Sequence, residues 1–510
     1  MLKQFYLIFL FTSVIYSQSI QKKFLNDNWF FTESGTRNWL PASVPGNIHT
    51  DLLNNKIIAN SDFWGNEKKL LWIEEKDWDY KTTFSVDEII LSKQNIEIAF
   101  EGLDTYANVY LNDSLIIRAT NMFRMWQCNC KGIIKKENNN LFIQFLSPSR
   151  MSDSIASLSE VKLSGDKLIY LRKTPYRLDY RHIFASSGIW KSVYLLSWND
   201  LKIEDVSFQQ ENITPEQVEL HVPFFLNCFT RDLYKISIKD TNNMITYAEK
   251  TDSLFEGYNL DALDFNLYNP RLWWTRELGT PEMYAFRFEV RKNNYVVDEK
   301  IFYIGIRKIE HVNEKDSLGR DIYFKLNNVP LYIKGANYIS QENYIKSLKI
   351  DEHKILMKDI NRSGINMFRV RGDGIYEDDE FYNQCDLNGI LVWQDFMFSD
   401  TIYPGESDFL ENVRIEVSQN ISRLKNHPCI ALWCGNNEIY EDEYSRDLQK
   451  QLVYSKKESI NISNNYKMIF ENIIPEALNS IVPSANYIPS SSKISRDLTD
   501  KFIFIYKGRF

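Results

Sequence analysis

The sequence has few of the residues that build disulfide frameworks or metal centres. Its 510 residues include six cysteines and six histidines, and neither set shows the spacing of a disulfide framework or a zinc site. Cys128 and Cys130 are the closest pair in the sequence, and a strand through them would point both side chains to one face. This favours packing over a disulfide or a metal site. We therefore predict no catalytic metal and no cofactor.

Strongly basic segments are also lacking. The chain has 60 Lys and Arg residues against 68 Asp and Glu residues, which gives a formal net charge of −8. A protein that binds nucleic acid or an anionic membrane needs a concentrated basic surface, and no basic patch rises above this acidic background. The composition argues against both kinds of partner and suits a neutral substrate.

Long apolar runs are confined to the first residues. Residues 5–16 are mostly apolar, follow Lys3 and precede Ser17 and Gln18, which is the layout of a secretory signal peptide over residues 1–17. The run is too short for a lasting anchor, no lipoprotein cysteine follows it, and no later window reaches membrane-spanning length. We expect an exported protein, periplasmic or extracellular, without membrane contact after cleavage.

Aromatic residues, in contrast, are abundant. They make up 14% of the chain, with 12 Trp and 29 Tyr. Large β-sandwich cores would use them, and so would surfaces that stack against sugar rings, so the composition leaves both uses open. At about one domain per 150 residues, the length predicts three or four domains.

The first 305 residues have the pattern of antiparallel β structure. Residues 18–196 contain short runs of alternating polar and apolar residues separated by turn signals, which predicts a β-sandwich. Residues 197–305 continue this pattern over about 100 residues, a length typical of an immunoglobulin-like sandwich.

The pattern changes after Gly305. We predict strands at 331–337, 367–371, 390–396 and about 429–434, with helices at 351–362 and 408–425. This alternation favours parallel pairing, either in a (β/α) barrel or in an open α/β sheet. Polar residues end each strand, and in a barrel they would meet at one mouth: Lys334, Asn337, Arg369, Arg371, Gln394, Asp395, Asn437 and Glu438.

The strand that precedes Glu438 points most directly to chemistry. An apolar run between Pro428 and Gly435 predicts a strand buried on both faces, and it leads into Asn436, Asn437 and Glu438. A carboxylic acid beside an amide suits glycoside hydrolysis, because the acid protonates the leaving oxygen while the amide holds a sugar hydroxyl. A helix-capping Glu and a turn-forming Asn436 are the alternatives.

Several segments together resemble the family 2 glycoside hydrolases, and most closely their β-mannosidase branch. The similar segments, in order, are residues 44–52, 72–78, 100–105, 187–190, 269–274, 305–307, 334–338, 392–396 and 433–438. The resemblance implies a jelly-roll-like β-sandwich, an immunoglobulin-like sandwich and a (β/α)8 TIM barrel over residues 306–510. It also implies an exo-acting retaining hydrolase that releases terminal non-reducing β-D-mannose from an oligosaccharide or glycoconjugate.

The same resemblance implies roles for individual residues. Glu438 matches the general acid/base and Asn437 the amide that binds a hydroxyl. Arg369, Trp393, Gln394 and Asp395 would support the sugar pocket, although Arg369 and Asp395 could equally be a structural ion pair.

Two departures from the family pattern concern the sugar pocket. Arg371 stands where an aromatic residue is usual, with Asp373 where glycine is usual, so charge replaces a flat stacking surface. Asp179 is the counterpart of an acid that reaches the terminal sugar from the N-terminal domain, but its aromatic neighbours are largely replaced. Other family 2 activities, such as β-galactosidase or β-glucuronidase, therefore stay open.

The catalytic nucleophile has no counterpart in this sequence. A retaining mechanism needs a second carboxylate, and no acid after Glu438 ends an apolar strand. The last ten residues do not resemble the continuation of the barrel, so we expect a C-terminally truncated barrel, frameshifted near residue 500, with impaired turnover and its nucleophile beyond residue 510. The alternative from another class is a non-catalytic carbohydrate-binding protein or pseudoenzyme.

Overall fold

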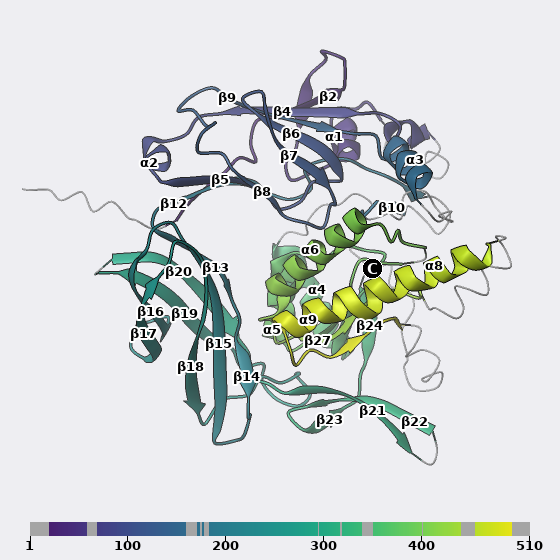
Figure 1. Ribbon diagram of the computed structural model, residues 1–510. Helices are drawn as coiled ribbons and strands as arrows, with labels where there is room; N and C mark the ends of the chain where they lie inside the picture. Colours follow the sequence, from purple (N-terminus) through teal and green to yellow (C-terminus); the bar gives the residue numbers. More distant parts are fainter. Residues whose placement is uncertain are drawn as a thin grey trace, which may run out of the picture.

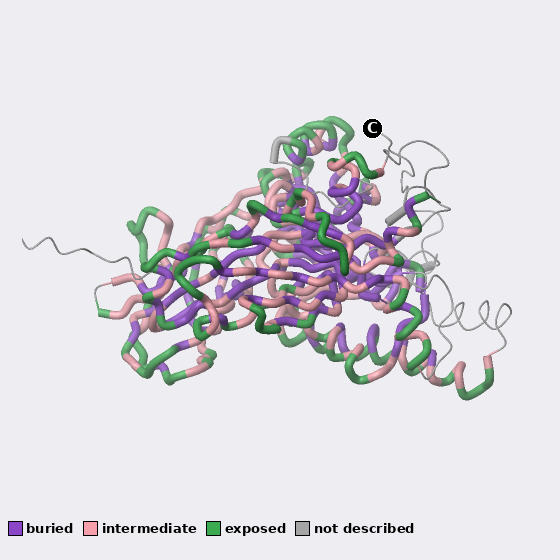
Figure 2. The backbone as a smooth tube through the Cα atoms, turned by 90° about the horizontal axis from the view of Figure 1, so that it is seen from above, coloured by how far each residue is buried: buried purple, intermediate pink, exposed green. Residues whose placement is uncertain are grey.

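The computed structural model describes residues 20–58, 69–159, 171–173, 176–177, 183–293, 295–316, 319–338, 350–399, 401–439 and 454–491. The expected signal peptide at residues 1–17 lies outside this part of the chain. Figure 1 shows three regions, with an N-terminal β region packed above a C-terminal α/β region and a second β region beside them. Buried residues concentrate inside these regions, whereas loops and outer helix faces are exposed (Figure 2).

The N-terminal region is a sandwich of two antiparallel sheets. The six-stranded sheet has the order β3 (Leu40–Ala42), β2 (Trp29–Glu33), β4 (Trp78–Phe84), β9 (Asn139–Phe145), β6 (Tyr106–Leu111) and β7 (Ser114–Thr120). The second sheet has the order β1 (Gln21–Phe24), β12 (Val193–Trp198), β5 (Asn95–Phe100) and β8 (Trp126–Asn129). Alternate residues of β9 are buried in the core between the sheets, as the period of a strand requires.

Shorter elements flank this sandwich. They are α1 (Ile48–Asn54), η2 (Leu71–Ile73), α2 (Glu88–Leu91), α3 (Pro148–Leu158), β10 (Tyr176–Arg177) and β11 (Ile183–Phe184). Helix α1 begins at the cap Asn47, whose side chain accepts a hydrogen bond from the Thr50 amide at 3.0 Å.

A buried carboxyl on α1 joins the residue after β3 to strand β4. Asp51 accepts hydrogen bonds from the Ser43 amide at 2.8 Å and from the Tyr80 hydroxyl at 2.9 Å. Burial raises the pKa of Asp51 to about 7, against the lowering effect of these two bonds. The carboxyl therefore titrates near neutral pH in the folded protein.

We expect the free energy of unfolding to fall as the pH rises from about 4 to about 7, because the folded pKa of Asp51 exceeds its unfolded value. This group contributes a slope of at most about 1.4 kcal/mol per pH unit. Asp51→Asn should flatten this part of a urea-unfolding profile, whereas the exposed control Asp113→Asn should leave it unchanged. An unaltered slope in Asp51→Asn would contradict the assignment.

The second β region also consists of two antiparallel sheets around one core. In one sheet, β15 (Gln217–Cys228) lies between β18 (Gly257–Tyr268) on one side and β13 (Leu201–Val206) and β14 (Gln209–Glu211) on the other. The other sheet has the order β17 (Thr246–Leu254), β16 (Asp232–Asp240), β19 (Tyr284–Lys292) and β20 (Tyr295–Ile304). Residues of both sheets form one hydrophobic cluster.

The C-terminal region contains a parallel sheet with helices. The described strands pair in the order β24 (Gly335–Tyr338), β25 (Met367–Val370), β26 (Leu391–Asp395), β27 (Ile430–Cys434) and β28 (Tyr487–Ile488). The helices are α4 (Ile350–Ser363), α5 (Asp379–Asn388), α6 (Ser407–Leu424), α8 (Lys456–Lys467) and α9 (Ile474–Ile481), with the π-helical turn η3 (Met468–Ile473) joining the last two. The predicted parallel pairing and both predicted helices are confirmed.

One strand prediction was wrong in its extent. The segment 331–337 is divided between β23 (Val329–Leu331) and β24. Strand β23 pairs antiparallel with β22 (Gly319–Leu326), which in turn pairs with β21 (Ile309–Asp316) in a separate sheet. A single apolar run can thus serve two sheets, because periodicity does not show where a chain changes partner.

The two faces of the parallel sheet enter different cores. Val392 and Trp433 belong to the cluster that includes Val413 and Val417 of α6. Trp393 and Leu432 belong to a separate cluster on the other face. Adjacent residues of one strand therefore face opposite sides, which decides which strand-end side chains can meet.

None of the helices in the described part of the chain is long and apolar enough to cross a membrane.

Candidate active site

Four of the expected residues meet in one buried network at the carboxyl ends of neighbouring strands, namely Arg369, Trp393, Asp395 and Asn437. Arg369 donates from Nη2 to Asp395 Oδ2 at 2.7 Å and to Asn437 Oδ1 at 2.9 Å. These residues come from β25, the end of β26 and the turn after β27. Parallel strands that follow one another bring their carboxyl ends to the same edge, so residues 68 apart in sequence lie in contact.

Asp395 is completely buried at the centre of this network. Its carboxylate also accepts hydrogen bonds from the Trp393 indole at 2.8 Å and the Gly372 amide at 3.1 Å. Burial raises the pKa of Asp395, while Arg369 opposes that rise. Burial acts to lower the pKa of Arg369, but Asp395 and also Glu438 raise it, so the guanidinium keeps its charge.

Glu438 is exposed, in contrast to the buried residues before it. Its backbone has a φ of 61°, a left-handed conformation that few non-glycine residues adopt. The Glu438 amide donates to Ser491 Oγ at 3.0 Å, which ties this turn to the segment after β28. Residues with such a sparsely populated backbone conformation cluster at functional sites, and Glu438 lies near enough to Arg369 to raise the pKa of the guanidinium.

Asn436 acts as a turn residue. Its Nδ2 donates to the Pro489 carbonyl at 2.8 Å and its Oδ1 accepts from the Ile439 amide at 2.9 Å. The side chain of Asn436 thus supports the backbone around Glu438.

The structure does not bring Gln394 to this network. Its Oε1 accepts from the Tyr382 hydroxyl at 2.7 Å and its Nε2 donates to the Asp395 carbonyl at 2.8 Å, in the layer between the sheet and α5. Trp393 and Asp395 flank it and face the other side. The alternation of strand side chains is the reason that Gln394 lies apart from the other expected residues.

Buried polar atoms without partners mark where a polar ligand would lie. Asn437 Nδ2, Asn337 Oδ1 and Asp373 Oδ1 have no hydrogen-bond partner among the described residues. They follow or belong to β27, β24 and β25, so all three are at the carboxyl edge of the sheet. A buried polar atom left unpaired costs about 1–3 kcal/mol, and hydroxyl groups of a ligand would satisfy all three.

Arg371 forms an ion pair with Asp373, one of the three residues that have an unpaired polar atom. Its Nη2 lies 3.0 Å from Asp373 Oδ2. The two residues that depart from the usual family pattern therefore pair with each other. Asp373 and Ser491 were absent from the expected site residues, although the position of Asp373 just after a strand end is a signal that could have found it. Asp179 lies outside the described residues.

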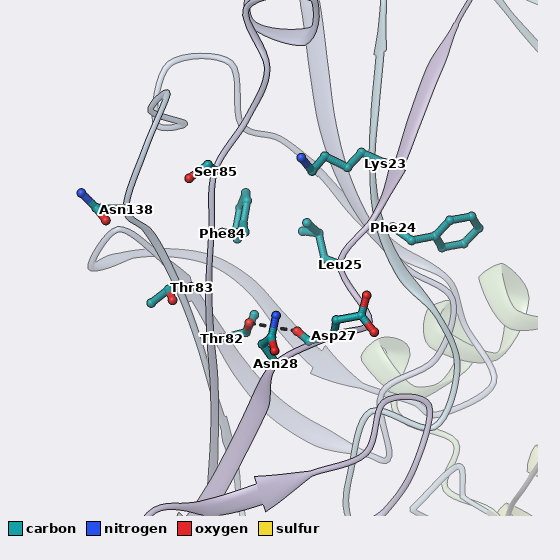
Figure 3. A pocket seen from close by; sticks show the side chains of 10 residues that line it. All are labelled: Lys23, Phe24, Leu25, Asp27, Asn28, Thr82, Thr83, Phe84, Ser85 and Asn138. Carbon is teal, nitrogen blue, oxygen red and sulfur yellow. Dashed lines mark hydrogen bonds between the residues drawn. The ribbon is translucent and has the colours of Figure 1, made fainter.

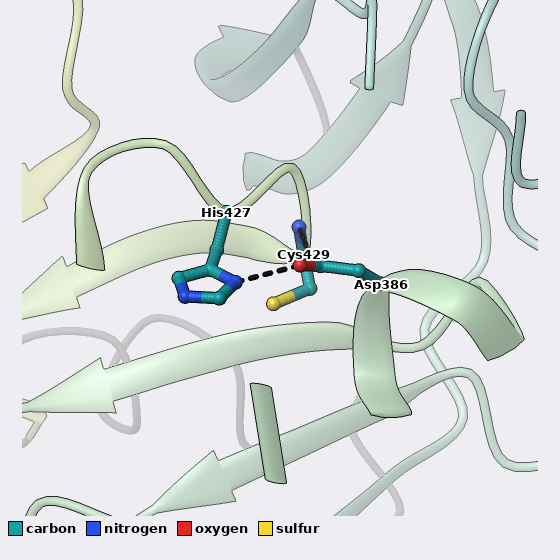
Figure 4. Close-up of side chains that lie close together, drawn as sticks. All are labelled: Asp386, His427 and Cys429. Atoms are coloured by element: carbon teal, nitrogen blue, oxygen red, sulfur yellow. Dashed lines mark hydrogen bonds and ion pairs between the residues drawn. The ribbon is translucent and has the colours of Figure 1, made fainter. Parts of the chain in front are cut away.

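Two further features are located elsewhere. Asp386, His427 and Cys429 gather near the start of β27, where Asp386 Oδ2 pairs with His427 Nδ1 at 2.6 Å (Figure 4). Because Asp386 Oδ1 also accepts from the Cys429 amide at 3.0 Å, hydrogen bonds account for this cluster. A hollow of about 380 Å³ between β1 and β4 lies in the sandwich, and Phe24 points away from it (Figure 3).

Comparison with known proteins agrees with this architecture. Residues 29–191 match the model described as "Glycosyl hydrolase 2 galactose-binding domain-like", and residues 202–307 match "Glycosyl hydrolases family 2". The chain is 28% identical to β-mannosidase B of Aspergillus flavus, over 93% of this chain and 58% of the relative. It is 29% identical to the β-mannosidase of Mus musculus, over 81% of this chain and 49% of the relative.

Solved structures give the same result. The β-D-mannosidase of Dictyoglomus thermophilum superimposes with a TM-score of 0.85 at 30% identity, covering 92% of this chain and 58% of that one. A β-glucuronidase of Bacteroides uniformis superimposes with a TM-score of 0.68 at 16% identity, covering 92% and 52%, and shares the fold. The chain spans less than two thirds of the length of these relatives. It carries glycosyl hydrolase family 2 domains and is a homologue of the β-mannosidases.

Proposed function

We propose that this chain carries the sugar site of an exo-acting retaining glycoside hydrolase, specific for terminal non-reducing β-D-mannose, with Glu438 as general acid/base. The network of Arg369, Asp395 and Asn437 beside Glu438 is the observation that carries this proposal. The homology to β-mannosidases supports the choice of sugar.

The geometry supports a separate role in catalysis or sugar binding for each of these residues. Glu438 would protonate the leaving oxygen and later take a proton from the attacking water. Arg369 occupies Asn437 Oδ1, which leaves the buried Nδ2 to donate to a sugar hydroxyl. Asp373 Oδ1 and Asn337 Oδ1 would accept from other hydroxyls. A retaining mechanism also needs a nucleophilic carboxylate about 5–5.5 Å from the acid/base, and we assign it to no residue of this chain.

We further propose that the parallel sheet belongs to a (β/α)8 barrel. Its described strands follow one another in chain order with helices between them, as barrel strands do. The candidate site then lies at the mouth formed by the carboxyl ends of the strands. Export under the direction of residues 1–17 remains part of the proposal.

A non-catalytic carbohydrate-binding protein is the second candidate. The match of residues 29–191 to a galactose-binding-domain-like model favours it, whereas the polar strand ends suit both functions. The two candidates differ in turnover but not in sugar binding, so both properties must be measured.

Sugar binding should depend on Asn437. We expect calorimetry with methyl β-mannoside to show binding that weakens about 10-fold in Asn437→Ala, because one hydrogen bond of about 1–1.5 kcal/mol is lost. The exposed amide control Asn129→Ala should bind as the wild type does. Aryl β-mannoside, β-galactoside and β-glucuronide assayed in parallel identify the preferred glycone.

Each outcome of this experiment has a distinct meaning. Equal affinities of Asn437→Ala and the wild type would contradict the role of this amide. Binding without turnover of any aryl glycoside would favour the carbohydrate-binding protein. Absence of binding to all three sugar types would overturn the proposed site.

A further inference from the structure

Arg172 connects the N-terminal sandwich with the sheet that carries the candidate site. It belongs to the described segment 171–173 and its side chain is 2% exposed. Its Nε donates to Glu416 Oε2 at 2.8 Å, its Nη2 to Glu416 Oε1 at 2.5 Å and its Nη1 to the Met397 carbonyl at 2.7 Å. The planar guanidinium thus binds a carboxylate and a backbone carbonyl at once, which suits Arg and not Lys.

Glu416 of α6 is the anchor for this guanidinium. Its side chain is fully buried and also accepts hydrogen bonds from Asn121 Nδ2 at 2.8 Å and the Tyr376 hydroxyl at 3.1 Å. Asn121 follows β7 of the sandwich, whereas Tyr376 follows β25. Because the buried charges are paired and hydrogen-bonded on both sides, the Arg172–Glu416 pair has one well-defined geometry.

The carbonyl that Arg172 binds is two residues after Asp395. The Arg172 guanidinium also lies 3.9 Å from the centre of the Phe398 ring. The next carbonyl of this segment, that of Phe398, accepts a hydrogen bond from the backbone N–H of Asn437 at 2.9 Å. A side chain at Gly372 would approach the Phe398 carbonyl to 2.4 Å, so the site backbone packs directly on this segment. Residues 396–399 are therefore held between Arg172 and Asn437.

Other contacts dock the sandwich on α6 without touching this segment. Asn412 Nδ2 donates to Thr120 Oγ1 at 3.2 Å and Asn412 Oδ1 accepts from Arg124 at 2.8 Å. Asn420 Nδ2 donates to the Phe123 carbonyl at 3.1 Å. Because these bonds join the same two regions, docking alone does not require the bond from Arg172 to Met397.

We propose that Arg172 is a positioning residue, through which the N-terminal sandwich sets the backbone that holds Asn437 in the candidate sugar site. The effect on sugar affinity rests on the proposed function, but the effect on the backbone does not. In this arrangement the sandwich contributes to the site without touching the sugar, and it does so through residues 396–399.

Hydrogen exchange and sugar binding of the full chain test this role. In Arg172→Lys, a single ammonium cannot make the bonds to Glu416 and to the Met397 carbonyl at the same time. Backbone amides in peptides covering 396–399 and 435–439 should therefore exchange about 10-fold faster. Binding of methyl β-mannoside should weaken about 10-fold. Exchange in α6 should stay as in the wild type. The matched variant Asn412→Ala loses the bonds of this side chain to Thr120, Asn121 and Arg124. It keeps the Arg172 bonds to Glu416 and Met397 and should leave both site segments protected.

Several results would overturn the proposal. One is that both segments of Arg172→Lys exchange at the wild-type rate. Another is that Asn412→Ala loses as much protection as Arg172→Lys, which would mean that docking of the sandwich alone sets the backbone. If Arg172→Lys fails to fold, Phe398→Leu removes the ring under the guanidinium, and unchanged exchange at 435–439 in that variant would also count against it. Absence of sugar binding by the wild type contradicts only the proposed function, because the exchange result stands by itself.

Discussion

Glu438→Gln should lower kcat for aryl β-mannosides by about 10²–10⁴-fold, the usual contribution of a general acid/base. The amide keeps the size of the side chain but cannot deliver a proton to the leaving oxygen. The loss should be greatest for substrates with poor leaving groups, because these need protonation most. Steady-state kinetics with a series of aryl mannosides measures this effect, and calorimetry should show that sugar binding persists.

The matched control for this variant is Glu471→Gln, an exposed helical carboxylate that should leave kcat unchanged. A Glu438→Gln variant with wild-type turnover on poor leaving groups would assign the acid/base role to another residue. If the wild-type chain binds the sugar but turns over no aryl glycoside, the carbohydrate-binding function is favoured over the acid/base role of Glu438.

Arg369→Met should destabilise the protein by about 3–5 kcal/mol, because it leaves the buried Asp395 carboxylate without its counter-charge. Urea unfolding measures this loss. The variant should also regain stability as the pH falls. Without Arg369, burial raises the pKa of Asp395 in the folded protein further above its value in the unfolded protein. The free energy of unfolding should therefore be highest at low pH and fall as the pH rises from about 4.

The double variant Arg369→Met with Asp395→Asn is the control for this interpretation. An amide at 395 carries no charge, so much of the stability should return and the pH dependence should disappear. A small, pH-independent loss in the single variant would instead mean that water solvates Asp395 in the folded protein.

Part of this site follows from local sequence patterns. Apolar runs located β25, β26 and β27, and the polar residues within or just after their ends included Arg369, Asp395 and Asn437. Strand alternation also predicts that Gln394 faces the opposite side of the sheet from Trp393 and Asp395, because it lies between them in the strand.

Other parts could not be predicted, because they depend on contacts between distant segments. Arg172 is one basic residue in a loop, and its partner Glu416 is 244 positions away on a helix. Ser491 binds the Glu438 amide across 53 positions. Local periodicity contains no information about such pairs.

Composition, strand and helix periodicity and the polar strand ends thus sufficed for two β regions, a parallel α/β region and the position of Glu438 just after a strand, because these depend on neighbours along the chain. Only the tertiary structure decided that Arg369 bridges Asp395 and Asn437 and that the sandwich reaches the site backbone through Arg172. The physical reason is that burial and pairing of polar groups are set by which surfaces pack together, and many sequences with the same local pattern pack differently.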